Sequence, residues 1–459
     1  MNRDMLIARA ARFLFRTTWG AVLLIFVAGL VTYVGTTVFY VGTSTIKNAV
    51  EADAEPGAEI WDLVDQDRYT VRAKEMISGE PYRDTYRQPL FPAFHALVFL
   101  VFGEHPTLLY NRLADSVLAA AGCVVIYLFG RRLFGHTVGL VSGLAATVHV
   151  NMVQKFSYIW GEVLVVPLLV LAMYFFVGFA DRRRWRDLLV GGLFFGLATL
   201  TRPTTYYLSF LFPVWLWVVY GRINRPMIVR SVAVVLVILV VVAPWAIHNT
   251  VVTGMFMPVS GPKWATLCMC YAPEQLDEPI GNHKGACVPI LEEEYGYVTP
   301  EERARIEQMS RHDQEQYWKE QFPKILRRVW KRVPELVLAR LLMFLTLYSS
   351  PGRSGVVYSA YRLQQVAMFV FFLAGLWLTR RQWRRLSVVY LVYLFLGAFI
   401  PLVFFGSPRR RLPVEPIIIV FACGFLVYVV EKFVLRKRAT SLTAPPTSTP
   451  AQAPEAPRS

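Results

Sequence analysis

Residues 160–180, WGEVLVVPLLVLAMYFFVGFA, decide the fold class of this chain. They hold a single ionisable side chain, Glu162, and about 20 apolar residues in helical form cross the hydrocarbon core of a bilayer. Similar runs recur along the 459 residues, of which 55% are apolar, and the mean hydropathy is +0.41. This composition excludes an ordinary soluble domain and predicts an all-α, polytopic integral membrane protein.

Positive charge between the apolar runs predicts the orientation of the chain. The formal net charge is +16, with 48 Lys and Arg against 32 Asp and Glu. Under the positive-inside rule the basic loops are cytoplasmic, and they lie at 130–132, 181–187, 220–230, 379–385 and 431–438. Charge distributed in this way indicates topology rather than nucleic-acid binding, so no nucleic-acid partner is expected.

Because the basic loops all lie on the cytoplasmic side, an even number of membrane spans must separate each loop from the next. About ten spans satisfy this condition, at residues 19–40, 113–129, 137–153, 160–180, 188–201, 204–220, 229–247, 362–378, 386–404 and 412–431. Two shorter apolar segments, 89–102 and 336–348, are predicted to be half-embedded helices on the outer face. The alternative, that both segments cross, would place Asp65 and Glu162 on opposite sides of the membrane.

The predicted topology divides the chain into three parts. We expect a basic cytoplasmic N-terminus at 1–18 and a transmembrane domain at 19–438, with large outer loops at 41–88 and 249–334. The tail at 439–459 is rich in Pro, Ala, Thr and Ser, which is typical of a disordered segment, here a cytoplasmic one.

Three cysteines share the second outer loop and can form one disulfide in an oxidising compartment. Cys287 is expected to pair with Cys268 or with Cys270, and the sequence leaves the choice open. Either pairing closes a loop of about 17–19 residues and would contribute roughly 3 kcal/mol in the loop-entropy model.

Acidic side chains near the membrane are the first candidates for chemistry. Asp65 and Asp67 belong to the loop sequence DQDRY, and if this segment is helical, Asp62, Asp65 and Tyr69 share one face. A carboxylate there can act as a general base or hold a cation, or it can be an ordinary solvated charge. Glu162 begins an apolar span, where an ionisable group is costly; the alternative is an interfacial acid that snorkels to water.

Arginines gather on the predicted outer side. They are Arg87, Arg112, Arg202, Arg340 and the triplet Arg409, Arg410 and Arg411. The triplet departs from the positive-inside trend, and a lipid phosphate is the natural partner of such a cluster. The alternative is contact with bulk anionic headgroups.

Several short motifs, taken in order, resemble one family. They are DQDRY at 65–69, RQPLFP at 87–92, NRL at 111–113, YLFGRRLFG at 127–135, GLATLTRP at 196–203, PWAIHN at 244–249, GMFMPVS at 254–260 and RLPVEP at 411–416. Together they resemble the polyprenyl-phosphate-dependent glycosyltransferases of the GT-C fold, in the superfamily of protein O-mannosyltransferases and aminoarabinose transferases. Gln66 stands where that family usually has a second acid, and Gln88 where the aminoarabinose transferases have Lys.

The resemblance implies an inverting transfer of sugar from an undecaprenyl- or dolichyl-phosphate donor to an extracytoplasmic lipid, glycan or protein acceptor. Asp65 and Glu162 would be the catalytic acids, with the seven arginines on the donor phosphate and Asp67, Tyr69 and Tyr82 on the substrate. No cofactor and no metal ligand set is assigned, and a divalent metal is left open. A bacterial-type inner membrane is the expected location. The alternative function is a transporter or a flippase of lipid-linked sugars, which would favour paired repeats and buried mid-membrane charge.

Overall fold

The structure, a computed structural model, describes residues 15–42, 60–79, 82–85, 87–104, 108–259, 263–273, 299–345, 356–404 and 406–434. In these ranges all regular structure is helical, which confirms the all-α fold class. Six helices of the described part are long and apolar enough to cross a membrane. The chain is an integral membrane protein.

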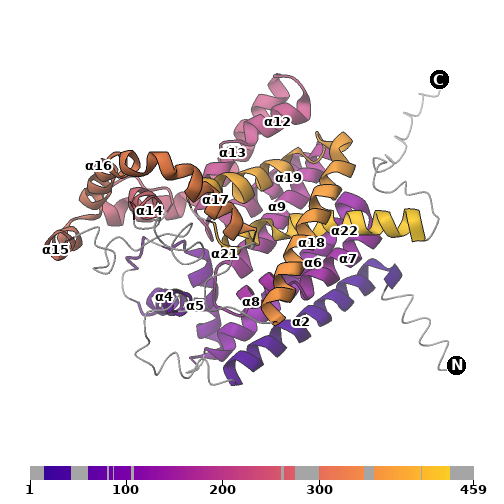
Figure 1. Cartoon of the computed structure of the whole chain (residues 1–459), viewed down its shortest axis with the longest axis horizontal. Coiled ribbons are helices and arrows are strands. Elements are labelled where there is room, and N and C mark those ends of the chain that lie inside the picture. Colours follow the sequence, from indigo (N-terminus) through magenta and orange to yellow (C-terminus); the bar gives the residue numbers. More distant parts are fainter. Residues whose placement is uncertain are drawn as a thin grey trace, which may run out of the picture.

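The bundle is built from helices that lie roughly along one direction (Figure 1). Its main helices are α2 (Thr18–Gly42), α6 (Leu109–Phe134), α7 (His136–Thr147), α9 (Glu162–Arg182), α10 (Trp185–Thr199), α13 (Arg225–Thr253), α18 (Val356–Thr379) and α22 (Glu415–Val429). α9 and α22 are largely buried inside the bundle, whereas α2, α13 and α18 expose more of their surface, as lipid-facing helices do.

Two of the predicted spans are divided into shorter helices, and a third is a continuous helix with a π-helical segment. Residues 137–153 form α7 and α8 (Val150–Phe156), and residues 204–220 form α11 (Thr204–Ser209) and α12 (Phe212–Tyr220). Residues 386–404 form α19 (Ser387–Val392), the π-helical segment η5 (Tyr393–Phe399) and α20 (Ile400–Val403). Hydropathy gave the position of these segments but not their breaks.

Close helix packing is set by small residues. Gly139 of α7 lies so near α6 that a Cβ added to it would be 2.7 Å from the carbonyl oxygen of Tyr127. The two helices are joined by Gly135, whose φ of 98° is the left-handed conformation that glycine tolerates. The α6–α7 hairpin therefore depends on glycine at both positions.

A second layer covers one end of the bundle. It contains α4 (Ile60–Ile77), α14 (Lys263–Cys270), α15 (Pro300–Gln308) and α16 (Arg311–Val329), and it lies away from the end where α2 begins and α22 ends (Figure 1). A small apolar core with Cys268, Cys270 and Trp318 joins α14 to α16. Cys287 is outside the described residues, so the disulfide stays a prediction.

The two half-embedded segments are short helices. α5 (Leu90–Phe102) has 13 residues and α17 (Val333–Phe344) has 12. At a rise of about 1.5 Å per residue each is roughly 20 Å long, less than the ~30 Å of a hydrocarbon core. Their lengths suit half-embedded helices, and their path in the membrane stays a prediction.

The arrangement of layers predicts that two exposed positions lie on opposite sides of the membrane. Glu301 lies in α15 and Arg381 in η4 (Arg380–Gln382), and both are exposed. In a background with the five native cysteines replaced, a membrane-impermeant maleimide should label Glu301→Cys on intact cells and Arg381→Cys only after permeabilisation. Labelling of both positions from the same side would contradict the topology.

Candidate active site

Glu162 is the centre of a polar cluster at the end of the bundle that α9 begins. Its side chain is buried, and Arg202 Nη1 donates to its Oε1 over 3.0 Å. Arg409 donates from Nε to Oε1 over 3.0 Å and from Nη2 to Oε2 over 3.4 Å. The pairs join three places in the chain: the start of α9, the turn after α10, and α21 (Pro408–Arg411).

Trp160 provides the platform for this cluster. The guanidinium carbon of Arg409 lies 3.9 Å from the Trp160 ring centroid, and the Lys155 ammonium lies 5.0 Å from it. Lys155 also lies 5.7 Å from the Tyr158 ring. The sequence analysis missed both Lys155 and Trp160. Their signal was a lysine among aromatic residues just before the Glu162 span.

Arg202 keeps its charge at this site. The pKa of Arg202 is lowered to about 10, mainly by burial. The nearby Glu162 carboxylate raises this pKa, whereas repulsion from Arg410 and Arg409 lowers it further. A pKa of about 10 still leaves the group protonated at neutral pH. Arg202 and Arg409 keep 13% and 24% of their side-chain surface exposed, so both guanidinium groups remain within reach of a ligand.

The segment before α5 brings Arg87 and Tyr69 to the same end of the bundle. Leu90 N donates to Leu200 O over 3.0 Å, which joins the start of α5 to the end of α10. The Arg87 guanidinium carbon lies 5.1 Å from the Tyr69 ring centroid, and Tyr69 contacts Phe91 edge-on at 5.1 Å.

The acidic sequence DQDRY was expected in a loop, and it lies instead on the helix α4. Asp62, Asp65 and Tyr69 therefore have the i, i+3, i+7 spacing of one helix face, and Tyr69 contacts Phe91 and Arg87. The side chains of Asp65 and Asp67 lie outside the described part of the structure.

Arg411 belongs to a buried network beside the cluster. Its Nε donates to Glu415 Oε1 over 2.6 Å and its Nη2 to Gln365 Oε1 over 2.8 Å, and it also bonds the carbonyl of Phe344. Asn151 Nδ2 donates to Glu415 Oε1 over 2.9 Å and to Pro408 O over 3.0 Å. The network joins α8, α17, α18, α21 and α22.

Arg340 is buried in a similar way on α17. Its Nη1 donates to the carbonyls of Leu402 and Val403 over 2.8 and 3.1 Å, and it also bonds the carbonyl of Cys270. These contacts join α14 and α20 through one guanidinium group. The two pairs differ in exposure: Arg340 and Arg411 are buried, whereas Arg202 and Arg409, which meet at Glu162, stay partly exposed.

The other predicted residues lie around this core. Arg112 Nη1 donates to Ser157 O over 3.0 Å, and Arg410 follows Arg409 on α21. Tyr82 packs on Trp245 and His248, and its carbonyl lies 2.8 Å from His248 Nε2. Within the described residues no three His, Cys, Asp or Glu side chains are grouped as metal ligands.

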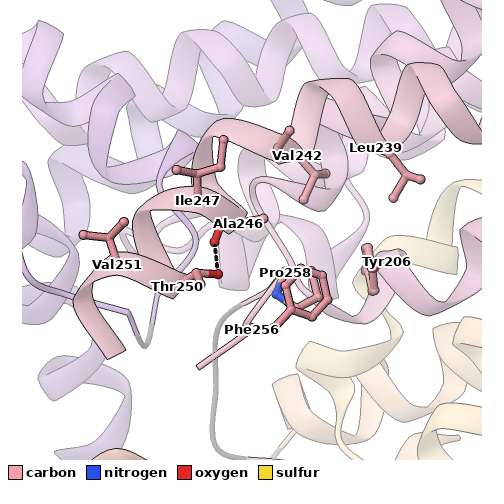
Figure 2. Close-up of a pocket in the computed structure, with 10 residues that line it drawn as sticks. Tyr206, Leu239, Val242, Ala246, Ile247, Thr250, Val251, Phe256 and Pro258 are labelled. Carbon is pink, nitrogen blue, oxygen red and sulfur yellow. Dashed lines mark hydrogen bonds between the residues drawn. The ribbon is translucent and has the colours of Figure 1, made fainter. Parts of the chain in front are cut away.

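An apolar groove opens between α11 and the second half of α13 (Figure 2). Its volume is about 440 Å³, and its lining includes Tyr206, Leu239, Val242, Ile247, Phe256 and Pro258. Tyr206 lies on α11, four residues after Arg202 in the chain, and most of the other residues come from α13.

A family model matches the middle of the chain. Residues 86–248 match the family described as dolichyl-phosphate-mannose-protein mannosyltransferase. The matched region extends from Arg87 to His248 and includes Glu162 and Arg202. This match confirms the resemblance found in the sequence motifs. No curated protein matches the chain.

Solved structures share the fold. An archaeal oligosaccharyltransferase, AglB from Archaeoglobus fulgidus in complex with an inhibitory peptide and a dolichol-phosphate, aligns with a TM-score of 0.50 and 11% identity, over 91% of this chain and 51% of that one. The Archaeoglobus fulgidus oligosaccharyltransferase in complex with Zn and sulfate aligns with a TM-score of 0.51 and 13% identity, over 91% and 50%. The chain spans about half the length of these proteins. ArnT from Cupriavidus metallidurans, bound to undecaprenyl phosphate, aligns over 78% of this chain and 72% of that one, with 16% identity and a TM-score of 0.34. The two oligosaccharyltransferase alignments show that the fold is of the GT-C type.

The buried network predicts a large effect of removing Glu415. Glu415→Ala leaves Arg411 buried without its carboxylate, which typically costs about 3–5 kcal/mol. The free energy of unfolding in mild detergent measures this loss. The control is Glu335→Ala, which removes the exposed ion pair with Arg332 and should cost about 1 kcal/mol or less. Equal losses in the two variants would contradict the role of the network.

Proposed function

We propose that the chain is an inverting glycosyltransferase that transfers a sugar from a polyprenyl-phosphate donor to an acceptor on the extracytoplasmic side of the membrane. The observation that carries this proposal is the pair of guanidinium groups, Arg202 and Arg409, held together by Glu162 at one end of a GT-C bundle. Guanidinium groups oriented in advance suit the oxygens of a phosphate. The donor is an undecaprenyl- or dolichyl-phosphate sugar, and the acceptor is a lipid, a glycan or a protein.

We assign different roles to the two acids. Glu162 accepts hydrogen bonds from Arg202 and Arg409, so its carboxylate positions the phosphate-binding groups and is a poor general base. Asp65 takes the role of the base, as the family resemblance implies, and it lies one helical turn before Tyr69 on α4, where Tyr69 contacts Arg87.

The proposed reaction is a single displacement at the anomeric carbon of the sugar. Asp65 accepts the proton of the acceptor hydroxyl while the hydroxyl oxygen forms a bond to that carbon. The bond between the carbon and the phosphate oxygen breaks on the opposite side, which inverts the configuration. The lipid phosphate leaves with the electron pair, and Arg202, Arg409 and Arg87 stabilise its developing charge.

Arg340 and Arg411 are assigned positioning roles in this proposal. Both donate to acceptors within the protein and both are buried, so they orient α20 and α21 and leave contact with the donor to the partly exposed Arg202 and Arg409. Asp67, Tyr69 and Tyr82 remain proposed substrate contacts, and Arg112 and Arg410 remain proposed members of the phosphate site.

The base assignment predicts the behaviour of Asp65→Asn. The change keeps the size of the side chain and removes the base, so the turnover number should fall by about 10²–10⁴. The measurement is sugar transfer in liposomes from a polyprenyl-phosphate sugar pool. Glu75→Gln, an equivalent change at a partly exposed site of the same helix, should stay within about twofold of the wild type. A turnover number of Asp65→Asn equal to that of the wild type would refute Asp65 as the base. If the wild-type protein consumes no polyprenyl-phosphate sugar, the glycosyltransferase proposal is refuted.

The groove supplies a place for the isoprenoid chain of the donor. Its lining is apolar, and one of its lining residues, Tyr206, follows Arg202 by four positions in the chain. A chain lying there would leave the phosphate beside the guanidinium groups. Each isoprene unit in the groove would contribute to binding through van der Waals contacts with the apolar lining.

Filling the groove should therefore penalise long donors selectively. Ala246→Trp places a bulky ring in the groove and should raise the KM for a full-length donor about tenfold, equivalent to ~1.4 kcal/mol. A donor with a single isoprene unit should be little affected. Leu236→Trp, on the exposed surface of α13 outside the groove, is the matched control. An equal change in KM for both donors would place the chain elsewhere.

A further inference from the structure

A second arginine cluster lies at the opposite end of α9 from Glu162. α9 has 21 residues, so its two ends are about 30 Å apart, close to the thickness of a hydrocarbon core. Arg183 follows α9, Tyr220 ends α12, and Arg230 lies in the first turns of α13. The three side chains meet at the end of the bundle that carries the basic loops 181–187 and 220–230.

Two aromatic rings hold both guanidinium groups. The guanidinium carbons of Arg183 and Arg230 lie 4.9 and 5.6 Å from the Tyr220 ring centroid, and 5.8 and 5.5 Å from that of Phe179. Hydrogen bonds add to this: Arg183 Nη2 donates to Val219 O over 2.6 Å, and Arg230 Nη2 donates to Arg183 O over 3.4 Å. Two positive charges are thus held close together by rings and carbonyls.

Three donors of this cluster have no acceptor among the described residues. They are Arg183 Nη1, Arg230 Nε and the hydroxyl of Tyr220, and all three atoms are buried. A buried donor without a partner costs about 1–3 kcal/mol. An acceptor bound among these neighbouring side chains would satisfy all three donors.

The nearby acids are engaged with other arginines. Asp181 pairs with Arg385 at 2.7 Å, and Asp187 pairs with Arg182 at 3.0 Å. Burial lowers the pKa of Arg183, and repulsion from Arg230 lowers it further, with Asp181 acting in the opposite direction. An anion bound between Arg183 and Arg230 would relieve this repulsion and satisfy the donors.

We propose that Arg183, Tyr220 and Arg230 form a phosphate-binding site at this end of the bundle. Guanidinium and phenol donors fit the oxygens of a phosphate group. The surroundings favour the phosphate of a lipid headgroup, because Trp185, which stacks with Arg230 at 5.2 Å, is 43% exposed and Ile223 is 72% exposed. Exposed aromatic and apolar side chains beside arginines are typical of the membrane interface. The bound phosphate would join the ends of α9, α12 and α13.

Native mass spectrometry of the full-length protein tests this site. The protein in detergent is titrated with phosphatidylglycerol, with phosphatidylcholine and with inorganic phosphate. The double variant Arg183→Gln/Arg230→Gln should bind phosphatidylglycerol about tenfold or more weakly, since two charge-assisted hydrogen bonds are lost. Tyr220→Phe keeps the ring under both arginines and should lower the affinity about two- to fivefold through loss of one hydrogen bond.

The matched control is Arg222→Gln, which removes one exposed charge from the same loop and should bind like the wild type. If inorganic phosphate competes with the lipid, and Tyr220→Phe weakens this competition, the site exists and its ligand is free phosphate. If the lipid binds and inorganic phosphate does not compete with it, the ligand is a lipid headgroup. Wild-type affinity in the double variant, or an equal loss in Arg222→Gln, would overturn the proposal. If the double variant does not fold, wild-type affinity in Tyr220→Phe is the result that overturns it.

Discussion

The geometry of the candidate site depends on the buried ion pair between Arg411 and Glu415. Arg411 ends α21, and Arg409 lies two residues earlier in the same short helix, so the contact of Arg409 with Glu162 requires α21 to keep its orientation. Glu415 and Asn151 give that orientation, because Asn151 bonds both Glu415 and the Pro408 carbonyl. A buried ion pair adds little net stability once desolvation is counted, but loss of one partner is costly. Its value here is that it holds α8, α21 and α22 in one arrangement.

The pair also explains how one carboxylate can serve two arginines. Glu162 is at the first turn of α9, and Arg202 and Arg409 approach it from helices that the network and the Leu90–Leu200 hydrogen bond hold in place. Trp160 orients Arg409 further by stacking. Groups held this way need little reorganisation when an anion binds, and such preorganisation is where electrostatic stabilisation has its largest effect. The apolar groove between α11 and α13 supports the proposal of a lipid-linked anion as the ligand.

Much of the fold was predictable from sequence, whereas the pairing within the site was not. Apolar runs at 160–180 and 229–247 correspond to α9 and α13, because a long apolar segment in a bilayer satisfies its backbone only as a helix. The contacts of Asn151 in α8 could not be predicted from the sequence, since its partners Pro408 and Glu415 lie about 260 positions away. Glu162, Arg202 and Arg409 stood out as charges at the ends of apolar runs. The triplet Arg409–Arg411 appeared to be one group, but successive residues of a helix point about 100° apart, so Arg409 meets Glu162 and Arg411 meets Glu415.

A cryo-electron microscopy structure of the full chain with bound undecaprenyl phosphate would test the central claim most directly. The account predicts the phosphate within hydrogen-bond distance, about 3 Å, of the guanidinium groups of Arg202 and Arg409. It also predicts the isoprenoid chain against Val242 and Ala246 in the groove beside α13. A phosphate bound away from both arginines, with their contacts to Glu162 unchanged, would contradict it.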